Sequence, residues 1–160
     1  MLKRNCFPTA KKIVDLLGGI DSFSHVRLDR PPFMRLCLEK LGDTGPRGLI
    51  VVSVAHYYEQ NGDLVADPEI CYEIDAGMWF PISYRQDSFG IHQEGEAGAV
   101  FVRDGKLFSR PGLVKSLTSF TRQWSINLAD QGFLDAAKQI VRGRVVAGNV
   151  PQDEDEESNQ

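Results

Sequence analysis

Hydrophobic residues near the N-terminus recur at the spacing of an α-helix. Residues 9–17 begin with a threonine that can cap a helix, and their apolar side chains form one narrow face: Ile13, Val14, Leu16 and Leu17. Two glycines follow, so the pattern predicts a capped helix that ends at Gly18. The pattern in residues 20–31 predicts a loop or a short extended segment. Residues 32–41 then carry apolar side chains at positions i, i+3, i+4 and i+7, followed by Gly42, and this spacing predicts a second helix.

From residue 49 onward the pattern changes to alternation with turn residues at short intervals, which predicts an antiparallel meander. The expected strands span residues 49–58, 69–75, 79–84, 89–93, 99–102 and 106–108. The first of them begins apolar on both faces, so we expect it at the centre of the sheet. In the second, Ile70, Tyr72 and Ile74 alternate with Glu69, Cys71, Glu73 and Asp75, which predicts one core face and one acidic face. Asp104-Gly105 predicts a type I′ turn between the last two strands.

Two more helical patterns complete the chain, over residues 111–128 and 133–141. The fold class predicted is therefore α+β: a single antiparallel β-meander of about five to six strands, flanked by N-terminal and C-terminal helices that pack on one face. Trp79, Phe80, Tyr84 and Trp124 are expected in the core, because their positions follow these strand and helix patterns.

The composition is that of one globular domain, since 42% of the 160 residues are hydrophobic and 25% are charged. We assign residues 1–150 to that domain. Residues 151–160, PQDEDEESNQ, hold five acids and no large apolar side chain, which predicts a disordered acidic tail. The chain has no apolar run of membrane-spanning length, no signal-peptide pattern and no paired cysteines, so we expect a cytoplasmic protein with reduced thiols.

The net charge of −4 conceals opposing blocks along the chain. Residues 54–100 hold nine acids against the single base Arg85, whereas residues 101–150 hold eight bases against three acids. An acidic middle beside a basic C-terminal half can orient the protein toward a charged partner.

Motifs for nucleotide hydrolysis, dinucleotide binding, α/β-hydrolase chemistry and zinc peptidase chemistry are absent from the sequence, so no catalytic residue, metal or cofactor is assigned. The pattern favours a non-catalytic binding or regulatory protein that recognises a protein partner through a polar, acidic surface on the sheet and its first turn. Polar side chains would supply directed hydrogen bonds and charge, and a tyrosine would supply contact area. The candidate binding residues are His56, Tyr57, Glu59, Asn61, Asp63, Asp67, Glu69, Glu73 and Arg85.

Two alternatives remain open. One is a metal-dependent hydrolase or nuclease centred on His56 with Asp63 and Glu69, because an imidazole and two carboxylates form a ligand set for a divalent cation. The other is nucleic-acid binding by the basic C-terminal helices. Its candidate residues are Arg110, Lys115, Arg122, Lys138, Arg142 and Arg144. Catalysis by Cys71 is disfavoured, since nearby carboxylates raise the pKa of a thiol.

Three stretches of the chain resemble one known family: HYYEQNGDLVADPEICYEID, WFPISYRQDSFGIHQE and RQWSINLADQGF. The patterns H-Y-x-E-Q-N-G-D-L, D-P-E and W-x-x-N-L-x-x-Q-G-F are similar to those of an uncharacterised bacterial family known as a domain of unknown function, over residues 32–135. Members of that family tend to be found on plasmids, integrative elements and phages. The resemblance implies an accessory protein of a mobile genetic element, and it carries no catalytic residues with it.

Overall fold

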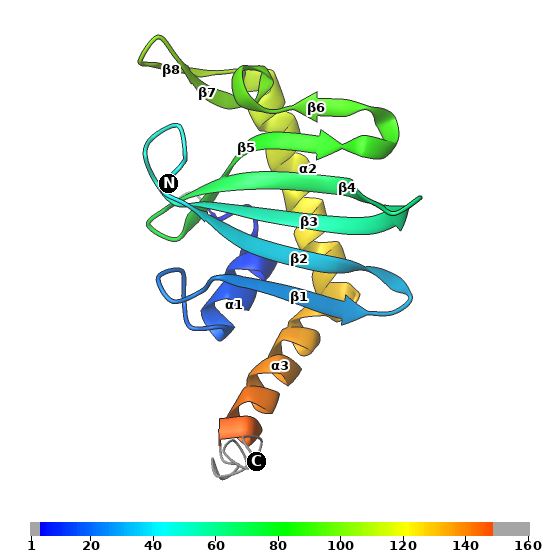
Figure 1. The fold of residues 1–160 in the computed structure, drawn as a ribbon. Helices are drawn as coiled ribbons and strands as arrows, with labels where there is room; N and C mark the ends of the chain where they lie inside the picture. Colours follow the sequence, from blue (N-terminus) through cyan, green and yellow to red (C-terminus); the bar gives the residue numbers. More distant parts are fainter. Residues whose placement is uncertain (1–3, 149–160) are drawn as a thin grey trace, which may run out of the picture.

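The computed structural model describes residues 4–148 (Figure 1). Helix α1 (Pro8–Leu16) is followed by six strands: β1 (His25–Arg30), β2 (Phe33–Gly42), β3 (Val51–Gln60), β4 (Asp63–Asp75), β5 (Met78–Gln86) and β6 (Ile91–Gln93). A hairpin of β7 (Val100–Arg103) and β8 (Lys106–Ser109) then leads into α2 (Pro111–Asp130) and α3 (Phe133–Gly148). Two short 3₁₀ turns, η1 (Asp87–Phe89) and η2 (Gly95–Ala97), flank β6. The predicted tail, residues 151–160, lies outside the described residues.

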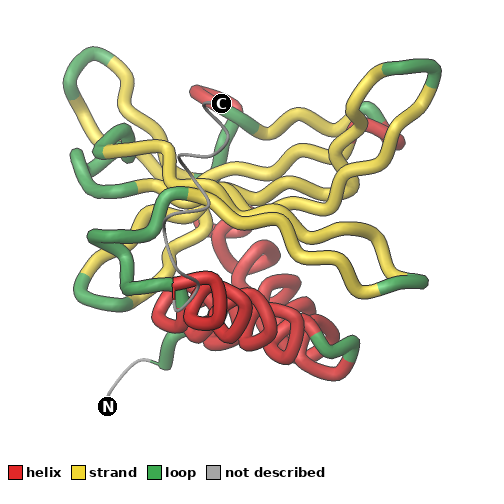
Figure 2. The backbone as a smooth tube through the Cα atoms, turned by 60° about the horizontal axis from the view of Figure 1, so that its bottom comes forward, coloured by secondary structure: helices red, strands yellow, loops and turns green. Residues whose placement is uncertain are grey.

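The six strands form one sheet in the order of the sequence, and each pairs antiparallel with the next. Helices α1, α2 and α3 all lie on one side of this sheet (Figure 2). The α+β class is therefore confirmed, with helices at both ends of the chain and a six-stranded meander between them. β3 occupies the central place that its doubly apolar sequence predicts, because it pairs with β2 on one side and with β4 on the other.

The helix predicted over residues 32–41 is wrong, because this segment forms β2. Leu36 and Leu38 are buried toward the helices, while Cys37 and Glu39 lie on the opposite face of the sheet. In this extended conformation the backbone of β2 can form hydrogen bonds with two neighbouring strands at once, and β2 does pair with β1 and with β3 along its length. The helical spacing in the sequence arose from Met34 and Leu41, two apolar residues that are exposed in the structure.

The predicted turn at Asp104-Gly105 is present, with both residues at positive φ, but the hairpin around it does not extend the meander. β7 and β8 form a separate two-stranded sheet. The chain leaves the main sheet at η2 and Gly98, where an added Cβ would stand 2.8 Å from the carbonyl oxygen of Ile82. A backbone that passes this close to β5 redirects the chain toward α2 instead of along the sheet edge.

The core lies between the sheet and the helices and is built around four aromatic side chains. The Phe7 ring centroid is 5.0 Å from that of Tyr72 and 5.4 Å from that of Trp124, and Tyr72 is 5.7 Å from Trp79. Both tryptophans are buried, as the sequence predicts, and Phe80 and Tyr84 are half-buried. No helix within residues 4–148 is both long enough and apolar enough to cross a membrane.

Candidate binding face

His56 lies on the helix-facing side of β3, in the core. Its side chain is 8% exposed, and its ring centroid is 5.6 Å from that of Trp124. With the proton on Nδ1, the ring donates to the backbone oxygen of Arg35 at 3.2 Å and accepts from Trp124 Nε1 at 3.4 Å. Burial lowers the pKa of His56, which favours this neutral ring. Both ring nitrogens are therefore engaged inside the protein.

The structure does not bring His56 together with the carboxylates of the predicted metal site. Asp63 lies at the tip of the β3–β4 hairpin, and Glu69 lies on the sheet face that the helices leave uncovered. Among residues 4–148 there is no group of three or more His, Cys, Asp or Glu side chains arranged to hold a metal ion. The hydrolase alternative thus gains no support from the described part of the chain.

The hairpin tip itself is explained by turn geometry. Asn61 and Gly62 have φ values of 55° and 85° between the paired residues Gln60 and Asp63, which is the conformation of a tight β-hairpin turn. Glu59, Asn61 and Asp63 are exposed around this turn. They stay accessible to a partner, but no interaction within the described residues fixes their side chains.

Glu69 and Tyr57 meet on the uncovered face of the sheet, which we call the open face. Ser53 Oγ donates to Glu69 Oε2 at 2.8 Å, from the neighbouring strand. Burial and the neighbouring Glu69 carboxylate raise the pKa of Tyr57 above its usual range. The protonated phenol is available as a hydrogen-bond donor on this face. The structure therefore places two of the predicted binding residues together, half-buried and held by β3 and β4.

Arg85 stands beside Glu69 in the cross-strand register and is held by an acid that the sequence reasoning did not select. Its guanidinium donates to both carboxylate oxygens of Asp87, at 2.7 Å and 3.2 Å. The backbone N–H of Ala66 donates to the same carboxylate at 2.9 Å. Arg85 and this backbone hydrogen bond lower the pKa of Asp87. Because the pair is bidentate, the guanidinium has a fixed direction on the open face.

The remaining two predicted acids serve the protein's own loops. Asp67 Oδ1 accepts from Gln86 Nε2 at 2.6 Å and from Ser88 Oγ at 3.3 Å. These hydrogen bonds connect β4 to the end of β5 and to η1. Glu73 is fully buried, although it alternates onto the same face as Glu69. The loop between β2 and β3 covers it, with Gly45 so near that a Cβ there would collide with the carboxylate. Glu73 is therefore not part of an accessible acidic surface.

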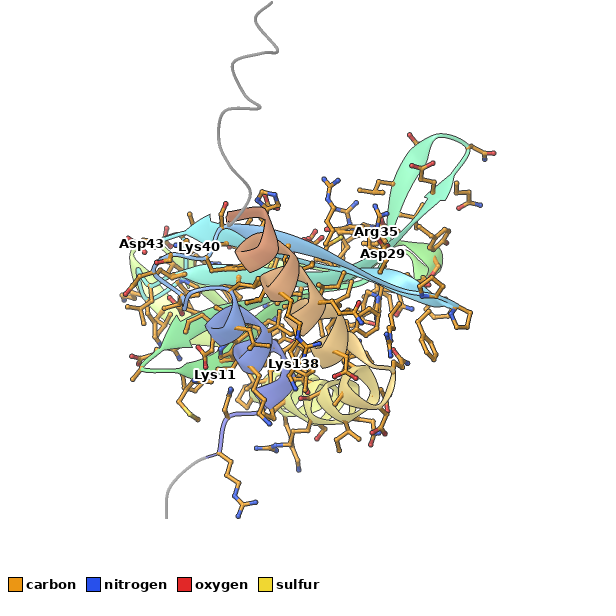
Figure 3. All side chains as sticks on the ribbon, turned by 90° about the horizontal axis from the view of Figure 1, so that it is seen from below. Lys11, Asp29, Arg35, Lys40, Asp43 and Lys138 are labelled. Atoms are coloured by element: carbon orange, nitrogen blue, oxygen red, sulfur yellow. The ribbon has the colours of Figure 1, made fainter. Side chains whose placement is uncertain are left out.

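A groove of about 580 Å³ opens on the same face beside Tyr57, between strands β1, β2 and β3. Arg35 Nε donates to Asp29 Oδ1 at 2.7 Å at its rim, and the two side chains face each other in Figure 3. Sequence reasoning missed the groove because the segment around Arg35 was predicted as a helix. Its charged and polar lining comes from alternate positions of the strands: Arg27, Asp29, Arg35, Cys37, Glu39 and Tyr57. The alternation of charged residues with Val26 and Leu28 in β1 was the signal available.

Comparison with known proteins identifies the family of this chain. The model of a domain of unknown function, DUF6908, matches residues 8–134. The chain belongs to this family. No curated protein and no solved structure matches it. The resemblance to an uncharacterised domain family is thus confirmed, and the DUF6908 match also takes in α1.

The DUF6908 match covers the whole open face but only part of the basic helical surface. The six basic residues of the nucleic-acid alternative are all exposed. Three of them lie beyond residue 134, on α3: Lys138, Arg142 and Arg144. Lys138 projects on the helix side of the molecule, together with Lys11 of α1 (Figure 3). The family match therefore includes every strand of the open face but leaves out half of the six basic residues of the nucleic-acid alternative.

Charge in this DUF6908 chain is separated by layer. The helical segments, residues 4–19 and 110–148, hold nine lysines and arginines against three acids. Residues 20–109, which contain the sheet, hold eight bases against fourteen acids. Since the helices lie on one side of the sheet, the two layers have opposite net charge (Figure 2). Such a separation orients the molecule in the field of a charged partner.

Proposed function

We propose that this DUF6908 protein is a non-catalytic binding or regulatory protein, and that it captures a protein partner on the open face of its sheet. One observation carries the proposal: helices cover a single face (Figure 2), and the other face holds a polar groove beside Tyr57 in which Asp29 orients the guanidinium of Arg35. On the same face, outside the groove, Asp87 orients the guanidinium of Arg85. An antiparallel sheet can leave one face in water, yet a solvated face does not need a groove of this size beside oriented guanidinium groups.

The chemistry of the open face fits a protein surface of mixed charge. Arginines and carboxylates alternate across it, and Tyr57 offers a large contact area at a small cost in conformational entropy. The β1–β2, β3–β4 and β5–β6 connections, which lie at one end of the sheet, add exposed apolar side chains, namely Phe33 and Met34, Leu64, and Phe89. Leu64 also lines the groove. Aromatic, methionine and arginine side chains are enriched in protein–protein interfaces.

Site-specific photo-crosslinking tests this proposal. A benzophenone amino acid replaces Tyr57 on the open face or, as the matched control, the exposed Ile126 on α2. In cells that carry the gene, we expect a discrete protein adduct from position 57 and none of the same mass from position 126. Adducts of equal yield at both positions would contradict an open-face interface.

Substitutions in the groove then test the affinity for the protein identified by crosslinking. Glu39→Lys and Tyr57→Ala should each weaken binding by about tenfold or more, as expected for residues at the centre of an interface. Asp130→Lys on α2 makes the same kind of charge reversal outside the groove and should leave the affinity within about twofold. Groove variants that bind as tightly as the unmodified chain would refute the proposal.

We also propose that the protein works in the cytoplasm as an accessory protein of a mobile genetic element. The support is the family resemblance, together with three cysteines that form no disulfide within residues 4–148. The neighbouring genes of DUF6908 members test the assignment. Replication, transfer or phage genes beside most members would support it, and metabolic operons would rule it out.

Nucleic-acid binding by the helical layer is a second candidate function, favoured by the excess of exposed bases on that layer. A fluorescent DNA duplex titrated at increasing salt should show a log–log slope of about −4 to −5 if four to six phosphates are neutralised. Lys115→Glu and Lys138→Glu should reduce that slope, whereas Lys106→Glu on β8 should not. A flat salt response would remove this candidate.

A further inference from the structure

A second cavity, which shares no lining residue with the groove of the open face, lies between the N-terminal segment, β5 and α2. Its volume is about 1260 Å³, larger than most small-ligand clefts. Its walls are mainly apolar, with Phe80 and Pro81 of β5 on one side and Val114 of α2 on another. Such a cleft is of a size and polarity that suit a small organic molecule rather than ordered water alone.

Three arginines line the cleft, and none of its lining residues within the described chain is an aspartate or a glutamate. They are Arg4, Arg47 and Arg122, which come from three separate parts of the chain. Arg47 Nη1 donates to Glu73 Oε1 at 3.3 Å, and its guanidinium carbon lies 5.7 Å from the centroid of the Phe80 ring. Its charge is thus compensated, and its position is fixed.

Arg4 and Arg122 differ from Arg47, because neither has an acidic partner among residues 4–148. Within residues 4–148, the cleft therefore has two arginines without an acidic partner beside an apolar wall. Guanidinium groups bind carboxylates, sulfonates and phosphates through paired N–H donors, which gives both charge and direction.

Cys6 also lines the cleft, but its thiol is not a reactive group. Its Sγ–H donates to the backbone oxygen of Trp79 at 3.2 Å. Burial raises the pKa of Cys6 to about 11, although the positive charge of Arg122 opposes the shift. A protonated thiol is a poor nucleophile, so the cleft has the chemistry of binding and not of covalent catalysis.

We propose that this cleft binds a small organic anion that carries a flat apolar group. Arg4 and Arg122 hold the acidic group, and Phe80 and Pro81 contact the apolar part. The cleft shares no lining residue with the groove of the open face, so this proposal does not depend on the proposed protein-binding function.

A fluorescence titration of the full chain with 8-anilinonaphthalene-1-sulfonate tests the proposal, because this probe has an aromatic body and one sulfonate. We expect saturable binding of one probe per chain below about 1 mM. Arg122→Gln and Arg4→Gln should each weaken it by about tenfold, as the loss of a charge-assisted hydrogen bond predicts. Arg142→Gln removes an equally exposed arginine from another helix and should change the dissociation constant by less than about twofold.

N-phenyl-1-naphthylamine provides the neutral comparison, since it has a similar aromatic body without the acidic group. It should bind about tenfold more weakly than the sulfonate. Circular dichroism of each variant shows whether the fold is retained, and a variant that fails to fold is replaced by Arg→Lys at the same position. Equal affinity for the neutral probe, no saturable binding, or sulfonate binding unaffected by both arginine variants would overturn the proposal.

Discussion

Removing the Glu73 carboxylate should destabilise the protein far more than its place on a strand face suggests. The buried carboxylate accepts the backbone N–H of Arg47 at 2.8 Å and that of Leu49 at 3.1 Å, and it pairs with the Arg47 guanidinium. Glu73→Ala leaves both backbone donors without a partner under the loop, at about 1–3 kcal/mol for each. We expect a loss of about 3 kcal/mol in the free energy of unfolding, and hence a fall in Tm of about 6–12 °C.

Urea unfolding followed by tryptophan fluorescence measures this loss, with circular dichroism as a second probe of two-state behaviour. Asp75→Ala is the matched control, because Asp75 is an exposed acid two residues further along β4 and should cost less than about 0.5 kcal/mol. Glu73→Gln should fall between the two, since the amide oxygen still accepts one hydrogen bond. A Glu73→Ala loss below about 1 kcal/mol, or equal to that of the control, would refute the anchoring role of this carboxylate.

Three further predictions concern buried polar groups. Because the folded state lowers the pKa of His56, the unfolded state binds a proton at this ring more tightly. The free energy of unfolding should therefore fall as pH drops below 6.5. Urea unfolding at each pH would measure this fall, and the part due to His56 should disappear in His56→Gln. Tyr72→Phe removes the 2.8 Å hydrogen bond to Thr121 and should cost about 1 kcal/mol in the same assay. Burial raises the pKa of Cys6 and Cys71 to about 11. In a Cys37→Ser chain, which lacks the thiol of the groove, Ellman's reagent should therefore label these two thiols near neutral pH much more slowly before unfolding than after it; rapid labelling of that native chain would contradict this.

The sequence predicted the elements whose hydrophobic pattern had a single periodicity. β3, with its apolar start, and α2, with its helical stripe, formed where expected. The prediction for residues 32–41 was wrong because their apolar positions fit a period of 3.6 as well as a period of two. The choice between the two depends on whether neighbouring strands are present, and those neighbours are distant in sequence. The error also hid the groove, since Arg35, Cys37 and Glu39 share a face only in a strand.

The candidate site was predictable as a set of residues but not as a surface. Alternation assigned Glu69 and Glu73 correctly to one side of β4. The structure places Tyr57 on the same side and His56 on the opposite one, although both were predicted to lie on one surface. Nothing in that alternation indicates which part of the face a loop will cover. Gly45 folds the β2–β3 loop onto Glu73, and the result is one structural carboxylate and one accessible carboxylate. For Cys71 the sequence predicted the direction of the pKa shift but not its main cause: burial raises this pKa most, and the Glu69 carboxylate adds a smaller rise.

The acidic middle of the sequence does not become a strongly acidic surface, because several of its carboxylates are neutralised locally. Asp87 is paired with Arg85, Glu96 with Arg103 and Glu73 with Arg47. Paired charges produce little field beyond about 8 Å at physiological ionic strength, so the open face must recognise a partner by directed hydrogen bonds and fit at short range. The helical layer keeps its excess of unpaired bases and hence its long-range field. Association through the open face should therefore depend weakly on salt, whereas association through the helices should slow steeply as salt rises.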